Sequence, residues 1–205
     1  MKRTATILGL AGAIAVLCAV ALAHRLDARR GSGAAESSEP LTPNSVYQLS
    51  SRWTADDDHV LQLNELQGQF RIVALIFTSC PAACPTLVKE LLKLDSQLPA
   101  RLREKTKFTL ISIDPERDTT AALRQYRDKM GLGRERWTLL RGNAADVREL
   151  AATLGFNYRQ TQTADFVHSK LVTLLNPRGE IIFQQAGVAT DTERLIGALD
   201  QARAR

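Results

Sequence analysis

The sequence predicts an α/β protein in which a sheet containing parallel strands is covered by helices. The main evidence lies in residues 71–98, where an apolar run rich in β-branched side chains is followed by leucines at helical spacing. The same order of strand and then helix recurs twice further along the chain. Because parallel strands need a crossover, usually a helix, this alternation predicts a sheet with helices on its faces.

Before this core, residues 46–53 and 59–63 are predicted to form an N-terminal β-hairpin around an acidic stretch at residues 55–58. His59 follows three aspartates, a combination that could hold a cation. Short polar stretches of this kind are more often solvent-exposed turns, so we expect an exposed turn here.

The first core strand begins at Arg71, and the helix after it starts near Pro85, which suits a first helical turn because it has no N–H. Between them lie Cys80 and Cys84, each followed by a proline. The buried face of this helix is predicted to contain Leu87, Val88, Leu91, Leu92 and Leu98.

The rest of the chain continues the alternation. Further strands are expected at residues 107–113, 137–140, 156–160, 170–175 and 180–184. The last two form a predicted hairpin over an Asn-Pro-Arg-Gly turn. Asp118 and Asn143 are the expected N-caps of two helices, and Thr190 with Glu193 forms a predicted capping box for the last helix.

Cys80 and Cys84 are placed at a helix N-terminus, where the helix dipole should lower a thiol pKa and favour the thiolate. If this stretch were helical, the two Cα atoms would lie about 6 Å apart, within the range of a disulfide. The pair could therefore be a redox disulfide, a two-thiolate metal clamp, or both in turn. A purely stabilising disulfide is less favoured, because so short a ring removes little chain entropy.

Composition argues against a nucleic-acid-binding surface. The net charge is +5 over 205 residues, but no Lys/Arg tract is interleaved with aromatic residues. Only two of the three cysteines lie beyond the leader, so a four-cysteine zinc framework is excluded.

The leader, residues 1–23, has a short basic start and then an apolar stretch typical of a signal peptide or a membrane anchor. Its Ala-Leu-Ala end favours cleavage, whereas its length favours retention as a transmembrane helix. Residues 24–44 are expected to be a flexible linker, and residues 45–205 one exported domain in the periplasm. In that oxidising compartment, a thiol pair needs a reductant partner unless it is a disulfide.

Two further residues are candidates for the same site, because function in α/β sheets lies at the carboxyl ends of strands. Asp114 ends a predicted strand and could lie near the cysteines, although fixing the Asp-Pro turn explains it equally well. His168 would complete a set of two thiolates and one imidazole, which suits Cu(I) and can hold Cu(II). Zinc would accept the same set of three ligands. A lone histidine before a strand is, however, more often a loop residue that binds no metal ion.

The motifs IFTSCPAACP, ISIDPERDT and FVHS, the last before a strand and an NPRG turn, resemble those of the Sco/SenC family. The resemblance covers roughly residues 45–200. Members of that family are membrane-anchored, thioredoxin-like copper proteins that help to assemble the binuclear copper site of cytochrome c oxidase. The resemblance implies a thioredoxin-like fold, one copper ion held by Cys80, Cys84 and His168, and a disulfide between the cysteines when they are oxidised. The implied partner is the copper-site subunit of the oxidase or another copper acceptor.

One departure from the family concerns the residue before the histidine. The family usually has Asp there, whereas this chain has Val167. Loss of that negative charge bears on the choice of recipient and on copper affinity.

These features are compatible with three functions. The first is a metallochaperone for copper, which is not an enzyme, and the second is a thiol-disulfide reductase that keeps the recipient's cysteines reduced. A spacer of three residues between the cysteines, and the lack of any proline between residues 116 and 176, count against a general oxidoreductase of thioredoxin type. A peroxidase is the least favoured, because the second cysteine would compete for the oxidised first one.

Overall fold

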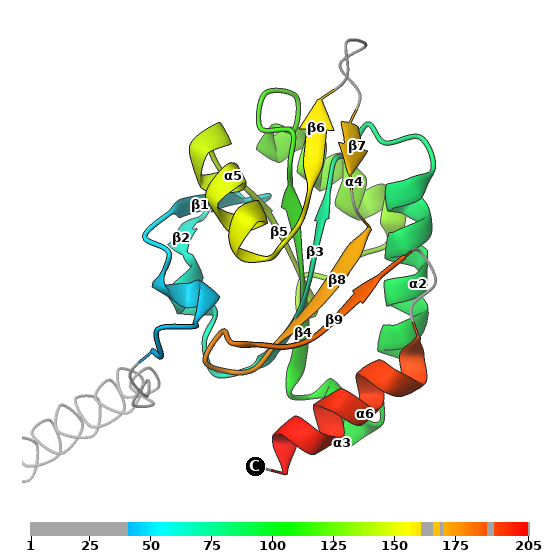
Figure 1. Ribbon diagram of the computed structural model, residues 1–205. Helices are drawn as coiled ribbons and strands as arrows, with labels where there is room; N and C mark the ends of the chain where they lie inside the picture. Colours follow the sequence, from blue (N-terminus) through cyan, green and yellow to red (C-terminus); the bar gives the residue numbers. More distant parts are fainter. Residues whose placement is uncertain (1–40, 161–165, 169, 188–190, 205) are drawn as a thin grey trace, which may run out of the picture. The chain divides into compact units, whose positions relative to one another are not determined.

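The structure is a computed structural model that describes residues 41–160, 166–168, 170–187 and 191–204, with only the backbone of residues 160, 167 and 168. Its main feature is a seven-stranded mixed sheet in the order β2-β1-β5-β4-β3-β8-β9 (Figure 1). The strands of this sheet are β1 (Arg52–Ala55), β2 (Val60–Gln62), β3 (Phe70–Ile76), β4 (Thr106–Ser112), β5 (Trp137–Arg141), β8 (Leu171–Leu175) and β9 (Ile181–Ala186). The central strands β3, β4 and β5 are parallel, and both flanking hairpins are antiparallel.

The helices are α2 (Ala83–Gln97), α3 (Ala100–Arg103), α4 (Thr120–Met130), α5 (Ala144–Thr153) and α6 (Thr192–Arg203). α2 and α4 pack together, and α5 covers the opposite face of the sheet (Figure 1). The strand order explains this arrangement. The crossovers through α2 and α4 join parallel strands and run in the same direction, from β3 towards β5, so their right-handed connections place both helices on one face. The connection through α5 leads instead to β8, which is antiparallel to β3.

The predicted α/β architecture and the N-terminal hairpin are confirmed. The hairpin is shorter than expected, because residues Val46–Gln48 form the 3₁₀ helix η1 instead of a strand. The Ser45 hydroxyl accepts a hydrogen bond from the Tyr47 N–H at 3.1 Å, which caps this single turn. A second 3₁₀ helix, η2 (Leu63–Leu66), follows the hairpin.

Two other predicted elements differ in detail. The edge expected at residues 156–160 is β6 (Tyr158–Gln160), which pairs with β7 (Phe166–His168) in a separate two-stranded sheet. The last helix is capped by Asp191, whose carboxylate accepts a hydrogen bond from the Arg194 N–H at 3.1 Å. The predicted cap Thr190 lies outside the described residues.

The acidic turn after β1 is only partly exposed. Asp57 and His59 are exposed as expected, but Asp56 is 2% exposed. Its two carboxylate oxygens each accept a hydrogen bond of 2.7 Å from the guanidinium of Arg127 in α4, which is also buried. This turn therefore ties the N-terminal hairpin to α4 through a buried ion pair.

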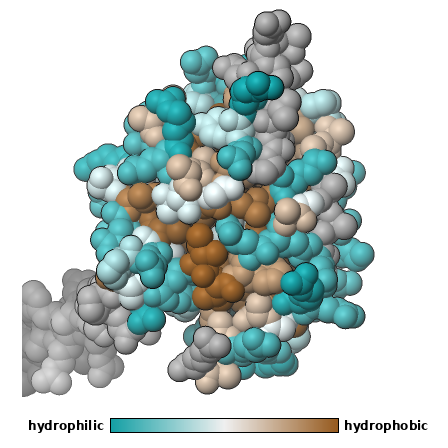
Figure 2. Space-filling model, viewed as in Figure 1, coloured by the Kyte–Doolittle hydropathy of each residue, from teal (hydrophilic) through white to brown (hydrophobic). Residues whose placement is uncertain are grey.

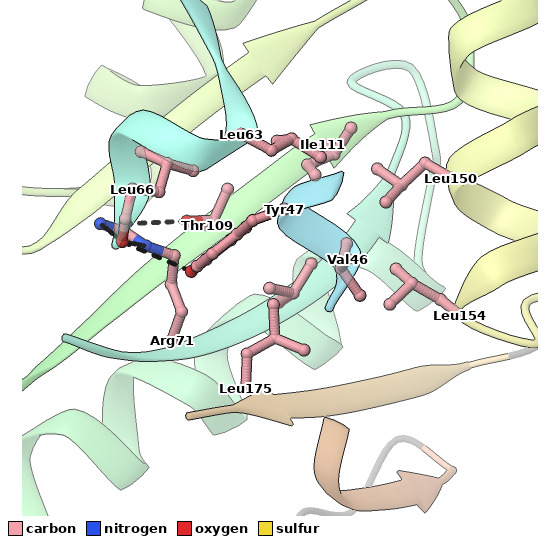
Figure 3. Close-up of a pocket in the computed structure, with 11 residues that line it drawn as sticks. Val46, Tyr47, Leu63, Leu66, Arg71, Thr109, Ile111, Leu150, Leu154 and Leu175 are labelled. Atoms are coloured by element: carbon pink, nitrogen blue, oxygen red, sulfur yellow. Dashed lines mark hydrogen bonds between the residues drawn. The ribbon is translucent and has the colours of Figure 1, made fainter. Parts of the chain in front are cut away.

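A small apolar cavity of about 10 Å³ lies between the sheet, η1 and α5 (Figure 3). The guanidinium of Arg71, which is 8% exposed, lines it and donates hydrogen bonds to the Leu66 carbonyl and the Thr109 hydroxyl. The hydroxyl of Tyr47 beside it donates to the same Leu66 carbonyl at 3.4 Å. The cavity has about the volume of one water molecule, so it is too small for an organic ligand.

On the face seen in Figure 2, a hydrophobic strip crosses the middle of the domain between hydrophilic borders. Ile181 in the edge strand β9 is one of two large apolar side chains that are exposed among the described residues, at 37%. Across the part of the chain that the structure describes, no helix is both long and apolar enough to cross a membrane. The leader proposed at residues 1–23 lies outside that part.

Candidate metal and dithiol site

The two cysteines meet where β3 runs into α2. Cys80 lies in the connecting loop and Cys84 is the second residue of α2, and they are 7% and 0% exposed. The Cys84 N–H donates a hydrogen bond to the Cys80 sulfur at 3.3 Å, and the two cysteines do not form a disulfide with each other in this structure. Ala82 at the N-cap has no side-chain acceptor and Pro85 has no N–H, so the Cys80 sulfur takes the place of the usual capping oxygen.

The prediction that the helix N-terminus would lower the thiol pKa is wrong for Cys84. Burial raises the pKa of this thiol, and the neighbouring Cys80 and Asp118 raise it further, whereas a hydrogen bond with the Phe77 backbone acts in the opposite direction. Removal of the thiolate from water outweighs the field of the helix. Cys84 is therefore a protonated thiol at neutral pH until a metal ion binds the sulfur or an oxidant reacts with it.

Asp118 does not cap α4, contrary to the prediction. The cap is Thr119, whose hydroxyl accepts a hydrogen bond from the Ala122 N–H at 3.1 Å. Asp118 is instead fully buried, and its carboxylate accepts hydrogen bonds from the Thr78 N–H at 3.1 Å and from the hydroxyls of Thr78 and Ser112, both at 2.5 Å. The segment after β4 is thus fastened to the loop that carries Cys80.

Asp114 is also buried, but its carboxylate forms an ion pair with Arg117 three residues later. Its N–H donates a hydrogen bond to the Ser112 hydroxyl at 3.0 Å. Both contacts lie within the Asp-Pro turn, which agrees with the expectation that Asp114 fixes this turn. Asp114 also lines an open cleft of about 290 Å³ beside β6, together with Phe166.

The β6–β7 hairpin, which carries His168, lies against the cysteine loop. In the backbone register, His168 pairs with Tyr158. The ring of Phe166 packs against Phe77, three residues before Cys80, with 5.2 Å between ring centroids. The side chain of His168 lies outside the described residues. Among the side chains that are described, no group of three His, Cys, Asp or Glu residues could hold a metal ion.

One residue beside the cysteines was not identified as a site residue from the sequence. Tyr126 in α4 is 4% exposed, and among the described residues its hydroxyl has no hydrogen-bond partner. Burial raises the pKa of this phenol, and the charges of Cys84, Cys80 and Asp118 raise it further. In the sequence, Tyr126 follows Leu123 and precedes Met130 at the spacing of an apolar helix face, so no pattern distinguishes its polar end.

The fold and the site together define a class: thioredoxin-like α/β proteins with a Cys-x-x-x-Cys pair at the start of the helix that follows the first parallel strand. The sequence profile of the SCO1/SenC family matches residues 42–203. The chain therefore belongs to this family, as its motifs indicated.

Individual relatives agree with this assignment. A Stutzerimonas stutzeri protein, named as a candidate copper-binding protein, is 33% identical over 129 aligned residues, and the match covers 61% of this chain and 62% of that protein. The match thus spans less than two thirds of that relative's length.

Two solved structures share the fold. Arabidopsis thaliana ScoI with copper bound has a TM-score of 0.64 and 22% identity, and the match covers 76% of this chain and 97% of that one. BsSco has a TM-score of 0.66 and 22% identity over 75% of this chain and 91% of that one. BsSco is described with a disulfide switch and as a member of the Sco family of cytochrome c oxidase assembly proteins. At these identities the likeness to the structures establishes the fold alone.

Proposed function

We propose that this protein binds one copper ion through Cys80, Cys84 and His168 and delivers it to the binuclear copper site of cytochrome c oxidase. The observation that carries the proposal is the contact between two buried cysteines, the Cys84 N–H and the Cys80 sulfur, next to the hairpin that contains His168. Copper bound to a ScoI of the same fold, and the name of the Stutzerimonas relative, favour copper over zinc.

The donor set fits copper chemically. Two soft thiolates suit Cu(I), and an added imidazole also allows Cu(II). In a strand, alternate positions share a face, so position 168 is on the face of β7 to which Phe166 belongs, and Phe166 packs towards the cysteine loop. Because burial keeps the Cys84 thiol protonated, copper binding has to release that proton. Three protein ligands leave the ion open to an incoming ligand from the recipient.

The cellular setting belongs to the same proposal. We expect an exported domain in the periplasm that is tethered to the cytoplasmic membrane by residues 1–23 and the linker at 24–44, or released if the leader is cleaved. A thiol reductant partner is then needed to keep the cysteines ready for copper. Val167 replaces the usual Asp next to His168 in the sequence, and the loss of that negative charge bears on recognition of the recipient and on copper affinity.

The test replaces His168 with Ala and measures Cu(I) affinity by competition with a chelator on the purified, reduced protein. Loss of one of three ligands should weaken binding by at least roughly tenfold, whereas oxidation and reduction of the dithiol should persist. The matched control is His59→Ala, because His59 is exposed in the turn after β1 and should leave copper affinity unchanged. Wild-type affinity in His168→Ala would show that this ligand set is wrong.

A second function, a dedicated thiol-disulfide reductase for the recipient's cysteines, is favoured by one observation. The Cys84 N–H already contacts the Cys80 sulfur, so the two residues are close in the reduced state, and BsSco of the same fold is described with a disulfide switch. The two functions separate in a strain that lacks the gene and is supplied with His168→Ala. Full oxidase assembly without added copper would favour the reductase, and loss of assembly that added copper restores would favour the metallochaperone.

A further inference from the structure

The position of the β6–β7 hairpin depends on side-chain packing. Among the described residues, β6 and β7 pair only with each other, in a sheet separate from the seven-stranded one (Figure 1). A strand of the main sheet is held by a ladder of backbone hydrogen bonds to its neighbours. The hairpin is held instead by contacts such as that of the Phe166 ring with Phe77 of the cysteine loop, with 5.2 Å between ring centroids.

The Asp-Pro turn, residues 114–118, contacts both parts of the candidate site. The guanidinium carbon of Arg117 lies over the ring of Phe166, 5.9 Å from its centroid, and the guanidinium pairs with the Asp114 carboxylate. The next residue, Asp118, accepts hydrogen bonds from Thr78 in the cysteine loop. Two neighbouring residues of one turn therefore contact the hairpin and the cysteine loop.

This turn is a firm support, because a side chain of the main sheet braces it. Arg141 in β5 donates hydrogen bonds to the carbonyls of Asp118 at 2.8 Å and Pro115 at 2.7 Å. Within the turn, the Asp118 N–H donates to the Asp114 carbonyl at 2.9 Å. The Asp114 side chain is 4% exposed, so the carboxylate that pairs with Arg117 is itself held by packing. The guanidinium is thus presented to the hairpin in a fixed orientation.

We infer that Arg117 is a positioning residue, which acts through Phe166 to hold the hairpin beside the cysteine loop and so sets where His168 meets the cysteine pair. A cation over an aromatic face is attracted by the quadrupole of the ring. A ligand held in place before the metal arrives loses less conformational freedom on binding, and affinity rises accordingly. The part that concerns copper rests on the proposed function, whereas the holding of the hairpin does not require a metal ion.

The experiment measures hydrogen exchange of the backbone amides in β6 and β7, on the purified, reduced and metal-free full-length protein, and Cu(I) affinity by chelator competition. The main variant is Arg117→Gln. The matched control is Arg148→Gln, because Arg148 is exposed and lines the same cleft as Phe166, so the same charge is lost nearby. Arg117→Lys keeps a cation that can lie over the ring.

Arg117→Gln should speed exchange in the hairpin about two- to fivefold and weaken Cu(I) binding by a similar factor. Arg148→Gln should change neither property, and Arg117→Lys should restore most of both. Because Arg117→Gln also removes the ion-pair partner of Asp114, it is repeated in a Phe166→Leu background. Loss of the ion pair is common to both backgrounds, whereas the ring contact is not, so hairpin exchange should not rise further there.

Failure of this inference is distinguishable from failure of the proposed function. The inference is overturned if hairpin exchange in Arg117→Gln matches the wild type, if Arg148→Gln speeds it equally, or if the effect persists in full without the Phe166 ring. Unchanged Cu(I) affinity in Arg117→Gln, in a protein whose wild type binds copper, also overturns it. If the wild type binds no Cu(I) but hairpin exchange responds as expected, the copper proposal fails and the holding of the hairpin by Arg117 stands.

Discussion

Replacement of Asp118 with Ala should loosen the cysteine loop and destabilise the whole domain. The substitution removes the acceptor of three hydrogen bonds, from the Thr78 N–H and from the hydroxyls of Thr78 and Ser112. Each bond to a charged group contributes about 1.5–3 kcal/mol, but removal of a buried carboxylate also returns its desolvation cost. We therefore expect a net loss of about 3 kcal/mol, a large share of the 5–15 kcal/mol that holds an ordinary domain.

Urea denaturation of the reduced protein measures this loss. With a slope of about 2 kcal/mol per molar urea, the midpoint should fall by about 1.5 M. The matched control is Thr119→Ala, the next residue, which removes only the cap of α4 and should cost about 1 kcal/mol. Asp118→Asn keeps the shape of the side chain and one acceptor oxygen, so its loss of stability should lie between those of Asp118→Ala and Thr119→Ala.

Cu(I) affinity should fall for the two Asp118 variants and stay unchanged for Thr119→Ala, since the Thr119 hydroxyl accepts its hydrogen bond from the Ala122 N–H of α4. If Asp118→Ala cost no more stability than Thr119→Ala and left copper affinity unchanged, the carboxylate would not hold the loop. The explanation offered for this buried residue would then be refuted.

Two further predictions concern stability. Burial acts to raise the pKa of Asp56, but the hydrogen bonds and charge of Arg127 outweigh burial and hold that pKa below its ordinary value. The ion pair therefore stabilises the fold above about pH 4, the ordinary pKa of an aspartate. This stabilisation is lost as the pH falls through the lowered pKa of Asp56 in the folded protein. Urea midpoints measured from pH 7 to pH 3 should thus fall steeply for the wild type. Asp56→Asn should lose about 3–5 kcal/mol of stability at pH 7, and its midpoint should fall less steeply as the pH is lowered. An equally steep fall in this variant would show that Asp56 is not the group responsible. Gly179→Ala should cost more than Gly68→Ala, because both glycines have positive φ but an added Cβ at Gly179 would lie 2.5 Å from the ring of Tyr47, while nothing lies within 4 Å at Gly68. Gly68→Ala should cost only the backbone strain of about 1–2 kcal/mol, and equal thermal midpoints for the two variants would show that Tyr47 yields without cost.

Much of the fold could be predicted because its signals are local. β3 is buried at all seven positions, and its apolar run was visible in the sequence. Asn143 caps α5 as expected, with its side chain accepting hydrogen bonds from the Ala145 and Asp146 N–H groups at 2.8 and 2.9 Å. Caps and helical spacing involve residues within one turn of each other, so neighbouring letters are sufficient to recognise them.

The predictions were wrong where two local signals, or a local and a tertiary effect, competed. Asp118 and Thr119 are both good N-caps, and only the fold shows that Asp118 is needed elsewhere, 40 residues away at Thr78. The helix dipole suggested a low thiol pKa at Cys84, but the extent of burial depends on everything that packs over the sulfur.

The sequence by itself determined the class of fold, the pair of cysteines at a strand–helix junction and, through its motifs, membership of the SCO1/SenC family. The tertiary structure decided which polar groups meet. It brought Asp56 to Arg127 across 71 positions and fastened Asp118 to the cysteine loop. Such partners are distant in the chain and become neighbours only when strand order and helix packing are set, so their chemistry cannot be recognised from local pattern alone.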